Sequence, residues 1–203
     1  MLSDWFQMGG PVMYPLLACS VIALAVVTER LIFSMRELKE RDPALVGRIL
    51  SYTEKGETAK AIAEGKNSND FVARTLVYGL THRDKSFSSA LLQAASRELK
   101  RFSRGLPVLD TIVTLAPLLG LLGTVTGLIR SYGLLGAQQL EAPTAISGGI
   151  AEALSATAFG LSIAIIALIP FNSLNARVEE ARHEIEDASN HLEMLLLEPA
   201  RKG

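Results

Sequence analysis

Two apolar stretches decide the fold of this chain: APLLGLLGTVTGLIRSY at residues 116–132 and GGIAEALSATAFGLSIAIIALIPFN at residues 148–172. They overlap two windows without charged residues, at 111–129 and 153–176, and a third such window covers residues 5–28. About 20 apolar residues, each rising about 1.5 Å along a helix, cross the ~30 Å hydrocarbon core of a bilayer. Each window is therefore predicted to be a transmembrane helix.

The composition favours a membrane protein and excludes other classes. Of the 203 residues, 49% are apolar, 20% are charged and 6% are aromatic, and the formal net charge is −1. A near-neutral chain with few aromatic residues has neither the basic stripe nor the stacking surface of a nucleic-acid-binding protein. Its single cysteine, Cys19, excludes an intramolecular disulfide, and its histidines have no metal-ligand spacing. We expect no nucleic acid, no metal and no cofactor.

The first window is interpreted as a retained span rather than a signal peptide. A secretory signal begins with basic residues and ends at a small-residue cleavage site. Here the segment before the window contains Asp4 and no Lys or Arg, and Glu29 and Arg30 follow the window. No nucleophile with a neighbouring base appears along the chain, so we do not expect an enzyme.

The basic residues predict the orientation. Of the 20 Lys and Arg, 15 lie between Arg30 and Arg104, and none precedes the first span or lies between Ser131 and Gly149. Because cytoplasmic segments carry the excess of Lys and Arg, the N-terminus is predicted to be outside and the C-terminus inside. Arg130, at the outer end of the second span, is expected to reach the headgroups.

The fold class is predicted to be all-α, with three transmembrane helices. Spacing of apolar residues predicts small helices at 44–52 and 58–63, a longer one from Ser86, and an amphipathic helix after the third span. Spans two and three are expected to extend as long cytoplasmic helices, span two as one rod with the preceding helix. The predicted segments are an outer one at 1–11, a span at 12–28, a cytoplasmic helical region at 29–106, a span at 107–130, an outer loop at 131–147, a span at 148–171 and a cytoplasmic helix at 172–203.

Spans two and three each carry a face of small residues. On span two the face comprises Pro117, Gly120, Thr124, Gly127 and Ser131, and on span three it comprises Ala153, Thr157, Gly160 and Ala164. Such faces let membrane helices pack closely without any transport role, and a threonine hydroxyl can bond the carbonyl one turn back. With midpoints near Leu119 and Gly160, Thr124 and Thr157 lie about 7 Å and about 5 Å outward, which predicts that they are roughly level.

Glu152 is a carboxylate within an apolar segment. An ionisable side chain at membrane depth costs on the order of 3 kcal/mol and usually faces a bundle interior or a partner. It lies about one turn from the outer end of its span, so solvation at the interface is the alternative. Asp110, at the inner end of span two, is read either as a cytoplasmic proton exit or, preferably, as paired with Arg104 or a partner cation.

Both stretches resemble the signature of the ExbB/TolQ family, distantly related to MotA stator proteins: AP-x-x-GL-x-GTV-x-G and GIAEAL-x-AT-x-x-GL. The resemblance implies a homopentamer in the inner membrane of bacteria, with periplasmic N-terminus, whose second and third spans line a pore. Within it stand single-span ExbD- or TolR-like subunits, each with a membrane aspartate. Proton motive force then drives work on a TonB- or TolA-like protein, for example for uptake across the outer membrane. The short outer N-terminal segment and compact cytoplasmic region depart from longer relatives.

The same resemblance assigns candidate residues. Thr124 and Thr157 take the pore-facing threonine positions, and Glu152 takes the glutamate of span three. Further candidates for a pore or packing face are Gly120, Gly127, Ser131, Ser155 and Gly160. Spans two and three contain no Asp, Glu, His or Lys near the midplane, so the titratable group must come from another chain.

The sequence leaves several readings open. ExbB, TolQ and a gliding-motility relative are not distinguished. A membrane scaffold that only assembles helices and an ion channel acting alone are readings from other classes. Protons are the expected coupling ion, because so few oxygen ligands are available to hold sodium.

Overall fold

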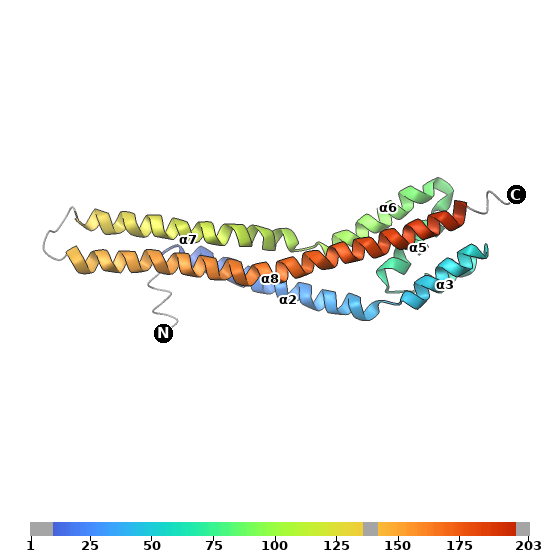
Figure 1. The fold of residues 1–203 in the computed structure, drawn as a ribbon, viewed down its shortest axis with the longest axis horizontal. Helices are drawn as coiled ribbons and strands as arrows, with labels where there is room; N and C mark the ends of the chain where they lie inside the picture. The colour runs from blue at the N-terminus through green and yellow to red at the C-terminus, as the bar shows by residue number, and fades with distance from the viewer. Residues whose placement is uncertain (1–9, 136–141, 198–203) are drawn as a thin grey trace. The chain divides into compact units, whose positions relative to one another are not determined.

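The computed structural model describes residues 10–135 and 142–197, and in those ranges the regular elements are helices without strands (Figure 1). The helices are α2 (Met13–Glu40), α3 (Pro43–Glu54), α4 (Thr58–Gly65), α5 (Phe71–Thr81), α6 (Arg83–Phe102), α7 (Leu106–Leu135) and α8 (Ala142–Leu197). Three of them, α2, α7 and α8, contain stretches long and apolar enough to cross a membrane. The predicted all-α class with three long apolar helices is confirmed. Parts of the predicted outer segments 1–11 and 131–147 and of the C-terminal segment lie outside the described residues.

The helices continue well past two of the three predicted spans. The helix of span one runs on to Glu40, although its charge-free window ends at residue 28. The helix of span three, α8, is continuous for 56 residues to Leu197, as the sequence predicts. Polar residues in its C-terminal part do not interrupt the backbone hydrogen bonds, because no breaker follows Pro170 within the helix.

Span two does not form one rod with the preceding helix, so that prediction is wrong. Helix α6 ends at Phe102, and Gly105 has a φ of +82°, which lies in the left-handed region. A glycine takes this conformation at little cost, whereas helix continuation requires a negative φ. Helix α7 then starts at Leu106 with Pro107 in its first turn, where the missing N–H leaves no hydrogen bond unmade.

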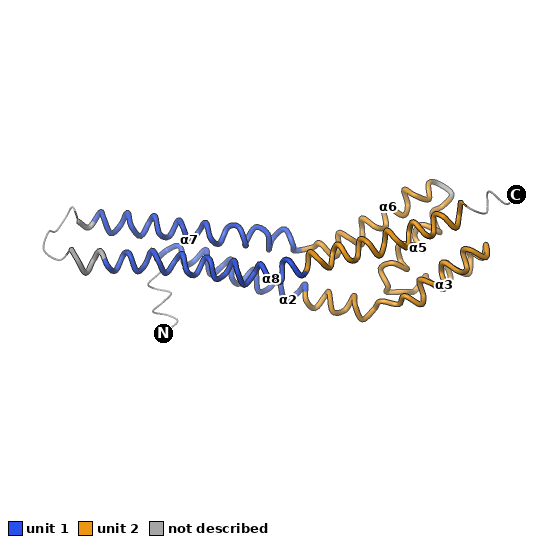
Figure 2. The backbone as a smooth tube through the Cα atoms, in the orientation of Figure 1, with its two compact units in different colours: residues 1–30, 105–173 blue, residues 31–104, 174–203 orange. Residues whose placement is uncertain are grey.

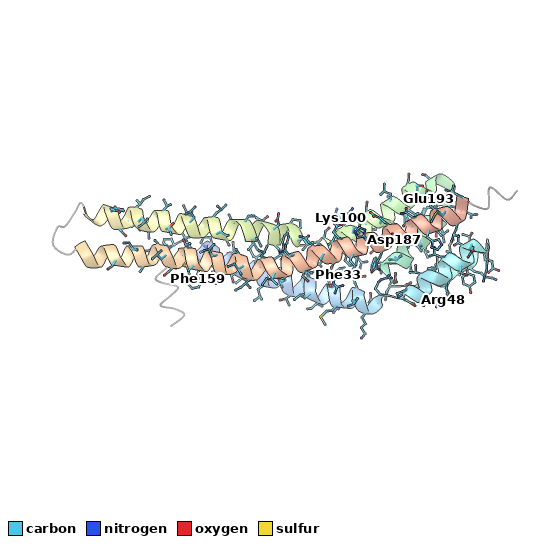
Figure 3. All side chains as sticks on the ribbon, viewed as in Figure 1. Phe33, Arg48, Lys100, Phe159, Asp187 and Glu193 are labelled. Carbon is cyan, nitrogen blue, oxygen red and sulfur yellow. The ribbon has the colours of Figure 1, made fainter. Side chains whose placement is uncertain are left out.

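One compact unit falls within residues 1–30 and 105–173, and its described part is coloured blue in Figure 2. In it α7 and the first part of α8 run antiparallel, and the start of α2 packs on both. The core residues are Val12, Met13, Leu16, Ala116 and Ala164, with Leu119, Phe159 and Ile163 partly buried against them (Phe159 is labelled in Figure 3). Large apolar side chains such as Leu118, Ile129 and Ile166 are exposed, as expected of helices that face lipid or other subunits.

The second unit consists of residues 31–104 and 174–203. Its core is formed mainly by α3, α5 and the end of α8, and includes Ile49, Leu76, Leu80, Ile185 and Leu192. Helices α3 and α4 confirm the small helices predicted at 44–52 and 58–63. Helix α5 is an addition: Asp70 caps it by accepting hydrogen bonds from the N–H groups of Val72 and Ala73, at 2.8 and 2.9 Å.

Buried charges tie the helices of the second unit together. Glu98 is 7% exposed and accepts hydrogen bonds from Arg74 at 2.9 Å and Arg101 at 2.6 Å, and Arg101 also reaches Glu37 at 3.0 Å. Burial lowers the pKa of Arg101, but its hydrogen bond to Glu98 and the nearby carboxylates outweigh this, so the pKa is raised and the guanidinium stays charged. Next to this cluster the rings of Phe33 and Phe102 meet edge to face with centroids 5.4 Å apart.

Candidate functional site

The two small-residue faces meet each other along the α7–α8 contact. A methyl group added at Gly160 would lie 2.4 Å from the carbonyl oxygen of Ala116, and one added at Gly120 would lie 3.0 Å from the Cα of Thr157. Nearer the connection between the two helices, Gly127 lies against Ala153. Only residues without a large side chain allow this approach of two backbones. The faces therefore pack the two helices within one chain.

Gly123 belongs to the same contact, although the sequence reading left it out of the face. It is buried against Ala156, whose Cβ would lie 2.4 Å from an added methyl group. The helical spacing i, i+3, i+7 selected Gly120 and Gly127 but passed over Gly123. A wider stripe covering about 100° of the helix would have included it.

The hydroxyl of Thr157 links the two helices. Its Oγ1 donates to the carbonyl oxygen of Gly120 at 3.0 Å, and the side chain is half-buried. The hydroxyl of Thr124, also half-buried, donates within its own helix to the carbonyl oxygen of Leu121 at 2.6 Å. Each hydroxyl keeps its oxygen lone pairs, so each can still accept a hydrogen bond from water or from a protonated acid.

Thr124 and Thr157 lie within about one turn of each other along the helices. Thr157 contacts Gly120, four residues before Thr124, whereas Gly123, next to Thr124, lies against Ala156. These two contacts place Thr124 and Thr157 between about 3 and about 6 Å apart in height.

Glu152 forms an ion pair with Arg130. Nη1 of Arg130 lies 3.1 Å from Oε1 of Glu152, and the two side chains are 55% and 27% exposed. Gly10, just before α2, lies so close that an added methyl group would be 1.9 Å from the same carboxylate oxygen. The sequence reading placed Arg130 among headgroups and did not connect it with Glu152, which is 22 residues away.

The remaining candidates have simpler surroundings. Ser131 is 2% exposed, and its hydroxyl donates to the carbonyl oxygen of Gly127 at 3.0 Å. Ser155 is half-buried on α8. Asp110 is exposed, and its pairing with Arg104 or a partner cation stays a prediction.

The described parts of α7 and α8 contain no acid or base in the middle of their apolar stretches. In the described stretches of α7 and α8 between Asp110 and Arg177, the charged side chains are Arg130 and Glu152, which pair with each other toward one end. The described residues also contain no cluster of His, Cys, Asp and Glu that could hold a metal ion. The polar groups in the middle of these two helices are therefore hydroxyl and backbone carbonyl oxygens, which can hydrogen-bond water or a partner acid but cannot carry a charge.

Comparison with known proteins points in one direction. The chain matches the model of the MotA/TolQ/ExbB proton channel family over residues 66–187, a stretch that includes α7 and the spanning part of α8. It is 38% identical over 204 residues to a protein of Synechocystis sp. named ExbB-like 1, covering 97% of this chain and 80% of that protein. It is 35% identical over 193 residues to ExbB-like 3 of the same organism, covering 88% and 90%. It is 45% identical to the Tol-Pal system protein TolQ of Pseudomonas aeruginosa over 91 residues, covering 44% of this chain and 39% of TolQ.

Proposed function

This chain belongs to the MotA/TolQ/ExbB proton channel family, and from that premise we propose that it is the pore-forming subunit of an energy-transducing complex of the inner membrane. In this proposal several copies, five by resemblance to the family, place α7 and α8 around a central pore. Proton flow through the pore drives work on a protein that spans the periplasm, as in uptake across the outer membrane. The N-terminus is periplasmic and the C-terminus cytoplasmic.

The proposal depends on one observation: the described middle parts of α7 and α8 carry hydroxyl oxygens but no titratable side chain. The hydroxyls of Thr124 and Thr157 lie where the described residues of α7 and α8 carry no charged group, and neither hydroxyl can hold a proton at neutral pH. A proton crossing this region needs a carboxylate from another chain. A single-span partner of the ExbD or TolR type, with an acid in its membrane segment, supplies that group.

The threonines have a positioning role in this scheme. Thr157 is fixed by its bond to the Gly120 carbonyl, so its oxygen is presented in one orientation. It accepts a hydrogen bond from the protonated partner acid or from water, and Thr124 does the same within about one turn of it. The available drive is about 2.3 kcal/mol per charge for each 100 mV of membrane potential, with the pH gradient in addition.

Among the family's systems, we favour the ExbB type. The ExbB-like proteins are similar to nearly the whole chain, whereas the TolQ similarity covers 44% of it. A TolQ-like subunit of an envelope system and a gliding-motility motor are the alternatives within the family. Deleting the gene and measuring energised uptake across the outer membrane, in parallel with outer-membrane integrity, separates the first two.

A non-conducting membrane scaffold is the second candidate function. It is favoured by the close packing of Gly120 against Thr157, which uses part of the small-residue face for helix contact. Under this reading the hydroxyls matter for packing alone, and no proton passes.

Proton flux in vesicles that contain the chain and a co-expressed single-span partner separates the two functions. Thr124→Val removes the candidate hydroxyl at nearly constant volume, and Thr126→Val is its matched control. Thr126 lies two residues away on the same helix, and its hydroxyl bonds only carbonyls of its own helix, those of Leu122 and Gly123. We expect Thr124→Val to reduce flux at least tenfold with assembly intact and Thr126→Val to conduct normally. Equal flux in the two variants would favour the scaffold.

A further inference from the structure

Arg130 and Glu152 meet because their side chains lean toward each other along the two antiparallel helices. Ser131 lies against Gly149, which places Arg130 level with residue 150, so Glu152 is about two residues, or about 3 Å, further along α8 than Arg130. In a helix the Cα–Cβ bond tilts toward the N-terminus. Arg130 on α7 therefore leans away from the α7–α8 connection and Glu152 on α8 leans toward it, which brings the two groups to 3.1 Å.

The segment before α2 also lies close to the Glu152 carboxylate. Gly10 has a φ of +67°, and a methyl group added to it would lie 1.9 Å from Oε1 and 2.8 Å from Cδ of Glu152. Gly10, three residues before α2, takes the left-handed conformation that favours glycine, and an added methyl group would displace the Glu152 carboxylate from its observed position. Glu152 is held between Arg130 on one side and the Gly10 backbone on another.

This geometry gives Glu152 a definite electrostatic partner in a segment predicted to lie in the membrane. Removing one member of this partly exposed ion pair leaves the other charge uncompensated, whereas removing both restores neutrality. The guanidinium is the more exposed of the two groups, so an unpaired Arg130 would present a positive charge to any cation that approaches this end of α7 and α8.

We propose that Arg130 and Glu152 form a fixed charge pair at the outer mouth of the pathway, in which the carboxylate neutralises the guanidinium and does not itself carry protons. Gly10 is the positioning residue that leaves room for this pair. The inference rests on the proposed function, since it assigns a role within proton conduction. Arg130 is thus assigned to the site, because it determines the net charge at the outer end of the proton pathway.

A charge-neutralising role and a proton-carrying role predict opposite results for a double variant. For Glu152→Gln we expect proton flux in vesicles with the partner subunit to fall about tenfold, because Arg130 then repels protons across a partly hydrated distance. For Arg130→Gln combined with Glu152→Gln we expect flux to recover to within about twofold of the unmodified protein. A double variant as inactive as Glu152→Gln would show that the carboxylate is a carrier and would overturn the proposal. Unchanged flux in Glu152→Gln would overturn it as well.

The role of Gly10 has its own matched pair. Gly10→Ala pushes a methyl group into the carboxylate, so we expect the flux loss of Glu152→Gln. Gly56→Ala also places an alanine at a positive φ, here +75°, but nothing lies within 4 Å of the position that its methyl group would take. We expect it to conduct normally. Equal flux in the two alanine variants would remove Gly10 from the account.

Thermal unfolding in micelles separates failure of this inference from failure of the proposed function. If neither the unmodified protein nor any variant conducts, the proposed function fails, but the pair is still measurable. A fixed pair predicts that the double variant is more stable than the sum of the two single changes implies. Strictly additive single changes would show that Arg130 and Glu152 do not interact, whatever the flux.

Discussion

Adding one methyl group at Gly160 tests the helix contact on which the site is built. The new Cβ would lie 2.4 Å from the carbonyl oxygen of Ala116, 3.1 Å from the Cα of Gly120 and 3.2 Å from its nitrogen. All three atoms belong to the backbone of α7, so no side-chain rotation relieves the overlap. The two helices must separate by about 1 Å to restore ordinary contact.

The expected cost follows from two opposing terms. Overpacking a tight contact costs about 3 kcal/mol at the upper end of its usual range. Replacing glycine by alanine within a helix returns about 1 kcal/mol. Gly160→Ala should therefore lower the free energy of unfolding by about 2 kcal/mol. The separation would also lengthen the hydrogen bond from Thr157 to Gly120, so proton flux should fall with stability.

A graded series of glycines supplies the controls for an unfolding titration in mixed micelles. Gly120→Ala meets backbone at 3.0 and 3.1 Å and should cost less than Gly160→Ala. Gly148→Ala meets nothing within 4 Å and should raise stability by up to about 1 kcal/mol. The reasoning fails if Gly160→Ala proves as stable as Gly148→Ala, since α7 and α8 would then not approach as described.

Three further changes test other contacts. Thr157→Val removes the hydroxyl between the helices, so it should lower the free energy of unfolding by about 0.6 kcal/mol and reduce proton flux at least tenfold. Thr157→Ser keeps the hydroxyl and should preserve stability and flux. Equal losses in the two variants would show that the hydroxyl is not responsible. Asp70→Ala removes a carboxylate that is 1% exposed and accepts hydrogen bonds from three backbone N–H groups, so it should cost about 3 kcal/mol. Asp42→Ala, which removes the exposed cap of α3, should cost about 1 kcal/mol, and equal losses at the two positions would contradict the burial of Asp70.

The three long helices were predictable because membrane crossing imposes length and polarity at once. Charge-free windows of about 20 residues have few other uses, so α2, α7 and α8 follow from the sequence. The break between α6 and α7 was not predicted, although Gly105 and Pro107 are both residues that commonly end or begin a helix. A glycine leaves the helical region when its surroundings favour this, and here Val26 lies 2.9 Å from the position of a Cβ on Gly105. That contact belongs to the tertiary structure and not to local sequence.

The candidate site divides in the same way. The small-residue faces were visible at helical spacing, and Thr157 lies on the face that meets α7. The Arg130–Glu152 pair was not predicted, because the two residues are 22 positions apart and their contact depends on how α7 and α8 pack against each other. One local signal was available and unused: Asp70 directly before the apolar run at Phe71 is a typical helix cap and would have predicted α5.

The central claim is that the half-buried hydroxyls of Thr124 and Thr157 lie next to the membrane acid of a partner helix, and disulfide cross-linking tests it most directly. A cysteine is placed at Thr124 and another at the membrane acid of the single-span partner, with Cys19 replaced by serine. The control cysteine replaces Ile166, which is 71% exposed on α8 and lines a groove against α2. The account predicts rapid cross-linking from position 124 and none from position 166. Cross-linking from position 166 alone would place the threonines away from the partner and contradict the account.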